Sequence, residues 1–237
     1  MTQNSKNESK KIVLHKLTWL EYIAMGFSAW FLFYPTPYYI LLVILLLIPI
    51  LGLFLNGLEK PSIASLVEID RNAKNEYDVA DFIDIPAFII FLRAILDFEL
   101  DSVMAVLVTS IIAFILILGF LFFTHKKIET SSKDKNWIYG SVIFCLYLYS
   151  YGAVVSINCA FDTSTPKVYA SKIIEKHIRR GTKGRKTHYV KVLPWGHHYD
   201  AEDIKVSASE YETYSVSDKV NIEYKEGLLG IPWYYLE

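Results

Sequence analysis

The stretch WIYGSVIFCLYLYSYGAVVSINCA, residues 137–160, contains no Asp, Glu, Lys or Arg over 24 positions, and it decides the class of fold. A helix needs about 20 apolar residues to cross the hydrocarbon core of a bilayer. Two further uncharged stretches, residues 38–58 and 102–123, are 21 and 22 residues long. In a chain of 237 residues that is 53% hydrophobic, these three stretches predict three membrane-spanning helices.

Two shorter apolar segments accompany these stretches. Residues 18–34 contain Glu21 and are followed closely by two prolines. We expect them to cross the membrane as the first arm of a hairpin with residues 38–58, and a helix lying flat on the membrane is the alternative. Residues 82–96 have only a short uncharged core, so they are expected to form an interfacial or re-entrant helix.

The region after the last span has a different pattern. Apolar and β-branched residues alternate with polar ones, and glycines and prolines separate the runs, which is typical of short β-strands. Strands are expected at residues 167–178, 186–195, 202–211 and 218–227, with a closing element at 227–237. The predicted fold is therefore a membrane α-helical protein, with about four transmembrane helices in two hairpins plus the interfacial or re-entrant helix, and a small C-terminal all-β domain, a barrel or a sandwich.

These features divide the chain into five parts. They are a polar N-terminal tail (1–17), a first transmembrane hairpin (18–58), an acidic connector with the interfacial helix 82–96 (59–101), a second transmembrane hairpin (102–160) and the C-terminal β domain (161–237).

The side of the membrane occupied by the β domain depends on whether residues 82–96 cross. Lys and Arg concentrate on the cytoplasmic side of spans. Four crossings place the β domain in the cytoplasm but leave the Lys-rich loop 125–135 outside. A fifth crossing by 82–96, or a flat first segment, places the β domain outside. The Lys-rich loop favours the extracytoplasmic location by a small margin.

The most basic segment of the β domain is HIRRGTKGRKTH, residues 177–188. Its glycine spacing does not match a phosphate-binding loop, and no aromatic pattern accompanies the charge, so neither nucleotide nor nucleic acid is expected. A solvated hairpin is the simplest interpretation. The alternative is contact with anionic lipid or an acidic partner through Arg179, Arg180, Lys183, Arg185 and Lys186.

Polar side chains of WGHHYDAED, residues 195–203, are the nearest approach to a metal site. The possible ligands are His197, His198, Asp200 and Glu202. Adjacent histidines in a strand point to opposite faces, and no H-x-x-x-H or C-x-x-C spacing is present. The segment is therefore interpreted as an exposed loop, with no metal or other cofactor, and the soluble parts offer no catalytic constellation.

Within the predicted spans, Glu21 and Asn158 are the polar side chains that invite a functional hypothesis. Glu21 lies within one turn of the start of its segment, which favours exposure to lipid headgroups. Asn158 is near the end of the last span, where its amide is expected to bond to another helix or mark the membrane exit.

Four phrases resemble a family of uncharacterised bacterial membrane proteins with several N-terminal spans and a C-terminal β module. They are FLRAILDF (91–98), INCAFDTSTP (157–166), YVKVLPWG (189–196) and EGLLGIPWYY (226–235). The resemblance implies a multi-pass protein of the bacterial inner membrane, and it carries over no catalytic residue.

The resulting functional hypothesis is a non-enzymatic membrane protein whose exposed β domain binds a protein partner at the bilayer. One version is an immunity or protective protein that recognises a membrane-active toxin. The alternative is a subunit of an oligomeric channel or transporter, which the polar residues in or beside the spans would serve.

Overall fold

The computed structural model describes residues 3–70, 76–128, 134–181 and 186–237. The chain forms two compact units. A helical unit comprises Met1–Leu96 and Met104–Ser156, and a β unit comprises Asp97–Val103 and Ile157–Glu237. The second unit therefore takes a short segment from the middle of the chain as well as the C-terminal region.

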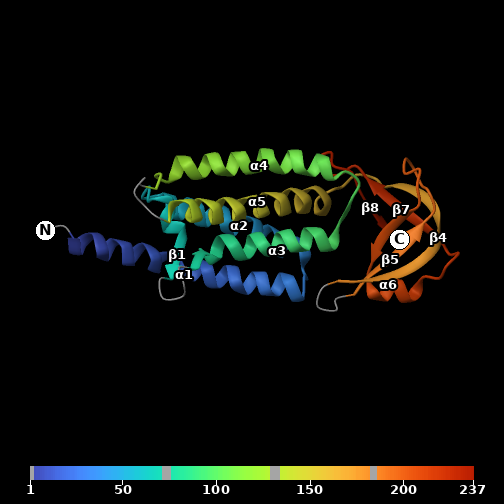
Figure 1. Ribbon diagram of the computed structural model, residues 1–237, viewed down its shortest axis with the longest axis horizontal. Coiled ribbons are helices and arrows are strands. Elements are labelled where there is room, and N and C mark those ends of the chain that lie inside the picture. The colour runs from blue at the N-terminus through green and yellow to red at the C-terminus, as the bar shows by residue number, and fades with distance from the viewer. Residues whose placement is uncertain (1–2, 71–75, 129–133, 182–185) are drawn as a thin grey trace. The chain divides into compact units, whose positions relative to one another are not determined.

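Five long helices follow one another along the chain (Figure 1). Among the described residues they are α1 (Gln3–Phe33), α2 (Tyr38–Gly57), α3 (Asp81–Asp97), α4 (Val103–Thr124) and α5 (Lys135–Ala160). The helices α2, α4 and α5 are long and apolar enough to cross a membrane, as the three uncharged stretches predict. The fourth predicted span lies in α1, whose apolar part, Leu17–Phe33, is a shorter apolar helix.

The helix α1 also continues into the segment predicted as a polar tail, since it begins at Gln3. It ends at Phe33, and α2 starts after Pro37, because prolines at 35 and 37 have no N–H to continue a helix. The rings of Phe31 and Tyr38 lie 5.1 Å apart across this turn.

Glycines let α3 approach its neighbours within the helical unit. A Cβ at Gly52 of α2 would come within 2.1 Å of the Phe82 ring, and one at Gly152 of α5 would come within 2.6 Å of the backbone of Phe91. Such small residues allow close helix packing. The prediction of a helix at 82–96 is confirmed, and its buried side chains recur at a helical spacing along one stripe: Phe82, Ile83, Pro86, Ala87, Ile90 and Ala94.

A small hairpin precedes α3, within the segment predicted as an acidic connector. Strand β1 (Val67–Asp70) pairs antiparallel with β2 (Glu76–Val79), after a short 3-10 helix, η1 (Ile63–Leu66). Polar residues alternate here with Val67, Ile69, Tyr77 and Val79, and short strands can satisfy their backbone groups by pairing.

The β unit contains one antiparallel sheet of six strands in the order β3-β8-β7-β4-β5-β6, which curls into a nearly closed barrel. The strands are β3 (Glu99–Leu100), β4 (Lys167–Arg180), β5 (Lys186–Val192), β6 (Glu202–Val206), β7 (Lys219–Lys225) and β8 (Trp233–Leu236). Each of the four predicted strand segments and the closing element contains an observed strand, and the sheet is barrel-like rather than a sandwich.

Two elements of the β unit differ from the prediction. Strand β3 comes from the acidic connector rather than from the C-terminal region. The end of the third predicted strand is instead a short helix, α6 (Ala208–Thr213), because Ser207 and Glu210 form a capping box that starts a helix there.

The barrel core is filled from alternate positions of the strands. Its buried side chains include Ile173, Val190, Val192, Ile204, Val220 and Ile222, together with Trp195 and Tyr234. A side-chain hydrogen bond links β8 to the edge strand β6, which it does not meet through the backbone ladder. The hydroxyl of Tyr234 in β8 donates to Glu202 Oε1 in β6 at 2.8 Å. This end of the barrel, where β6 begins and β3 ends, holds the site described next.

Candidate functional site

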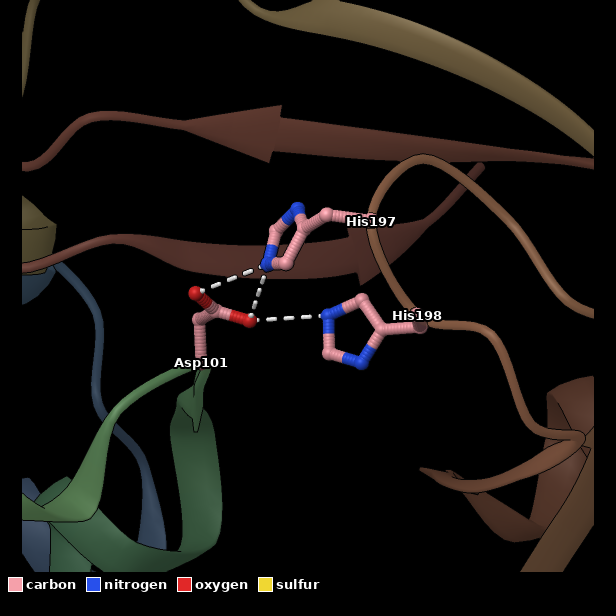
Figure 2. Close-up of side chains that lie close together, drawn as sticks. All are labelled: Asp101, His197 and His198. Atoms are coloured by element: carbon pink, nitrogen blue, oxygen red, sulfur yellow. Dashed lines mark hydrogen bonds and ion pairs between the residues drawn. The ribbon is translucent and has the colours of Figure 1, made fainter.

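Three side chains converge at one end of the barrel: Asp101, His197 and His198 (Figure 2). The Nε2 atom of His197 lies 3.1 Å from Asp101 Oδ1 and 3.2 Å from Oδ2, and the Nε2 atom of His198 lies 2.8 Å from Oδ1. Both imidazole rings turn toward the same carboxylate. We call this group the Asp-His-His cluster; its donor atoms lie within 4.8 Å of one another.

Asp101 reaches the cluster because the short strand β3 is added to the edge of the barrel. Glu99 pairs with Tyr234 and Leu100 with Trp233, and the Asp101 N–H then donates to the carbonyl of Pro232 at 3.0 Å. Its carboxylate is thereby held next to a loop that lies 96 positions later in the chain. Sequence patterning missed this residue, because nothing local to the acidic connector signals a partner so distant.

The two histidines converge because they belong to a tight turn rather than to a strand. The Trp195 N–H donates to the His198 carbonyl at 3.1 Å, and the His198 N–H donates to the Trp195 carbonyl at 2.8 Å. Gly196 occupies the first central position with a φ of +52°, a conformation that hairpin turns beginning with glycine use. The argument that adjacent histidines point to opposite faces therefore does not apply here.

Gly196 is also required by space. A Cβ at this position would meet the ring of Tyr169 at 3.2 Å. The Gly-His pair inside WGHH was the one local sequence signal for this turn, since glycine at the first of two loop residues is typical of a type II′ hairpin.

The ring of His198 is held from two sides. It stacks on Trp195, with ring centroids 4.2 Å apart, and its Nδ1 atom lies 3.2 Å from Glu202 Oε2. Burial, together with the charge of Glu202, raises the pKa of Tyr234, so its hydroxyl stays protonated and donates to Glu202. In many metal sites, the ring nitrogen of a histidine that does not bind the metal donates to a nearby carboxylate. Glu202, which accepts from Tyr234, is in position to be that carboxylate for His198.

Two buried polar atoms of this group remain without an aligned hydrogen bond. Among the residues that the structure describes, these are His198 Nε2 and Glu202 Oε2, despite their short distances to neighbouring atoms. Buried polar atoms are rarely left in this state, since each costs about 1–3 kcal/mol. A ligand at the cluster would complete His198 Nε2, whereas Glu202 Oε2 lies beside the other ring nitrogen, His198 Nδ1.

The donor set suits a transition-metal ion. Zinc binds imidazole nitrogen and carboxylate oxygen at about 2.0–2.2 Å, so two donors of a tetrahedral site lie about 3.4 Å apart. The distances from Asp101 to both histidines, 2.8–3.2 Å, need only small adjustments to reach that value. Three protein ligands would leave a fourth position for water or a substrate, and the His197 side chain is 52% exposed to solvent.

A second group of acids lies in the helical unit, where Asp78, Asp81 and Asp84 come together at the start of α3. Asp81 and Asp84 occupy the first turn of that helix, where carboxylates stabilise the positive end of its dipole. The helix dipole accounts for Asp81 and Asp84, whereas Asp78 comes from the preceding strand β2.

The basic residues proposed for lipid or partner contact separate into different environments. Arg179 donates to Asp203 at 2.6 Å, and its guanidinium lies over the Tyr189 ring. Arg180 and Lys186 pair opposite each other in the β4–β5 register, and both are exposed. Lys183 and Arg185 lie outside the described residues.

The two polar residues assigned to spans also differ. Glu21 is half-buried in α1. Asn158 is fully buried, and its side chain bonds to the backbone of Leu229 and Ile231. Its amide therefore serves the C-terminal loop of the β unit rather than another helix.

Comparisons of this chain with protein-family models, with curated proteins and with solved structures find no match. The bacterial membrane family named above stays a resemblance, and the Asp-His-His cluster is interpreted from its own chemistry.

Proposed function

We propose that this chain is a multi-pass membrane protein whose C-terminal barrel binds one divalent transition-metal ion, zinc before others. The ligands are Asp101, His197 and His198, with Glu202 as the outer partner of His198. The observation that carries the proposal is the convergence of two imidazoles on one carboxylate from sequence positions far apart. Imidazole and carboxylate donors with an open position are typical of zinc sites.

The position of Asp101 in the chain supports a site close to the bilayer. Asp101 precedes the first residue of α4, Val103, by two positions, and α4 is long and apolar enough to cross a membrane. Two residues span at most about 8 Å between Cα atoms. If α4 crosses, the ion is bound at the membrane surface, and the Lys-rich loop 125–135 favours the extracytoplasmic face of a bacterial inner membrane.

Zinc content of the purified full-length protein tests the proposal. After zinc loading in lipid nanodiscs and removal of free metal, the wild type should retain about one zinc per chain, measured by mass spectrometry of the metal. The variant His197→Ala/His198→Ala should retain almost none. His188→Ala is the matched control, because His188 packs against Tyr211 at the other end of β5 and should leave the zinc content unchanged.

Either of two results would contradict the proposal: a wild type that retains no zinc, or a double variant that retains as much as the wild type. The variants can be compared only if they unfold cooperatively, which circular dichroism of the β unit establishes.

A second candidate function is binding of an acidic partner or anionic lipid by the β4–β5 hairpin, with an immunity-type protein as one version. Its support is the exposed pair of Arg180 and Lys186, for which no ion-pair partner is found among the described residues, whereas Arg179 is paired with Asp203. The double histidine variant separates the two functions, because it removes the zinc ligands and leaves the hairpin unchanged.

A further inference from the structure

The loop at residues 227–232, GLLGIP, exposes two adjacent leucines although it is tightly fixed. Leu228 is 52% exposed and Leu229 is 45% exposed. Large apolar side chains that stay exposed in a rigid loop favour contact with another apolar phase.

Asn158, in the last turn of α5, fixes this loop. Its main-chain carbonyl accepts the Leu228 N–H at 2.9 Å, and its side-chain oxygen accepts the N–H groups of Leu229 and Ile231 at 2.9 Å and 3.4 Å. Its side-chain nitrogen donates to the Ile231 carbonyl at 2.7 Å. The loop backbone therefore lies directly against the end of α5.

The entry to the loop has no space for a larger residue. Gly227 has a φ of +76°, and a Cβ there would come within 2.3 Å of the Ile231 carbonyl oxygen. The backbone that leads into the leucine pair is thus constrained at Gly227.

Asp162, two residues beyond α5, fixes the flank of the loop. Its carboxylate accepts the Gly227 N–H at 3.0 Å and the Trp233 indole N–H at 2.9 Å. Burial acts to raise the pKa of Asp162, but hydrogen bonds from Ser164, Trp233 and Gly227 together hold it below its usual value. The ionised carboxylate therefore supports the loop at neutral pH, and this support is lost only as the pH falls through that lowered pKa.

A lysine and an aromatic side chain complete the surroundings. The Lys225 ammonium donates to the Asp162 carbonyl at 3.0 Å and lies 5.5 Å from the centre of the Trp233 ring. Exposed leucines beside Trp and Lys, at the end of an apolar helix, are the composition found where a protein meets the headgroup region of a bilayer.

We infer that Leu228 and Leu229 insert into the boundary between headgroups and acyl chains beside the end of α5, and so fix the barrel to the bilayer. This rests on the proposed function in one respect, that α5 and its neighbours cross the membrane. The lipid surface is favoured as the occupant because the loop is bonded to the last turn of a helix that is long and apolar enough to cross a membrane.

Fluorescence quenching from defined depths tests this inference. In full-length protein with Cys145 and Cys159 replaced by Ala, a single cysteine at Leu229→Cys carries an environment-sensitive fluorophore in nanodiscs. Spin-labelled lipids with the label close to the headgroup should quench it at least about twofold more than aqueous iodide does.

Two further positions calibrate the measurement. Leu116→Cys, in the middle of α4 and 69% exposed, reports whether that helix is in lipid. Val216→Cys is 55% exposed and precedes the start of β7, whereas the loop follows its end, so the strand separates them by about 20 Å. This label should be quenched by iodide only. Each labelled variant counts as folded when its unfolding temperature matches that of the cysteine-free parent.

The outcomes are distinct. If the Leu229 label behaves like the Val216 label while the Leu116 label is quenched by lipid, the inference that the loop inserts into the bilayer is wrong. The proposal of a membrane protein then still stands. If the Leu116 label is itself quenched only by iodide, both the loop and the proposed membrane topology are wrong.

Discussion

Asn158→Ala should destabilise the β unit by roughly 3–5 kcal/mol, because three hydrogen bonds from its side chain to buried or half-buried backbone groups disappear together. The Ile231 carbonyl and the N–H groups of Leu229 and Ile231 would lose this partner, and a cavity would remain where the amide packed. In a unit of about 90 residues, that loss corresponds to a fall in unfolding temperature of roughly 15 °C or more.

Thermal unfolding of the full chain, followed by the circular dichroism of the barrel, measures this effect. Asn136→Ala is the matched control, since Asn136 lies in the same helix but is exposed near its start. It should shift the unfolding temperature very little. An equally small shift for Asn158→Ala would show that the amide does not hold the loop.

Asp101→Ala should abolish the stabilisation of the barrel by zinc. A zinc ion that binds only the folded state adds about 2.7 kcal/mol to the free energy of unfolding when the free zinc concentration is about 100 times its dissociation constant. For a unit of this size, that raises the unfolding temperature by roughly 10 °C or more. Asp101 is the one ligand that both histidines approach, so its loss should weaken zinc binding at least about 100-fold.

The control for this substitution is Asp200→Ala. Asp200 is an exposed carboxylate two residues beyond His198, and it lies outside the Asp-His-His cluster. Zinc should raise the unfolding temperature of this variant as it does for the wild type. Equal zinc stabilisation of the Asp101 and Asp200 variants would remove Asp101 from the site.

Patterns that are local in the sequence predicted much of the fold. The uncharged stretches gave α2, α4 and α5, because a span must be continuous and apolar. Period-two alternation predicted β4, β5, β6 and β7, since each strand contributes buried side chains to the barrel core. The prediction that the third strand continues to residue 211 is wrong, because Ser207 and Glu210 form a capping box that starts a helix.

The candidate site could not be predicted in the same way. Asp101 lies beside His197 and His198 only because β3 pairs with β8. A strand of two residues is too short to show an alternating sequence pattern, so this long-range pairing could not be predicted. The histidines required knowledge of the turn at Gly196, whose positive φ reverses the chain between Trp195 and His198.

Asn158 illustrates how a polar residue in an apolar stretch can be misjudged. Its sequence position suggested a polar group serving other helices or a transport pathway, yet both atoms of its amide are bonded to the C-terminal loop. A buried amide that replaces missing backbone partners is a common structural use. The channel alternative therefore loses one of the residues that motivated it.

The central claim is that one metal ion is bound by two imidazoles and a carboxylate at the end of the barrel. X-ray absorption at the zinc edge, recorded on the loaded full-length protein, tests it most directly. The account predicts a first shell of nitrogen and oxygen at about 2.0 Å, two imidazoles in the outer scattering, and no sulfur. A zinc shell containing sulfur from Cys145 or Cys159, or the same spectrum from His197→Ala/His198→Ala, would contradict it.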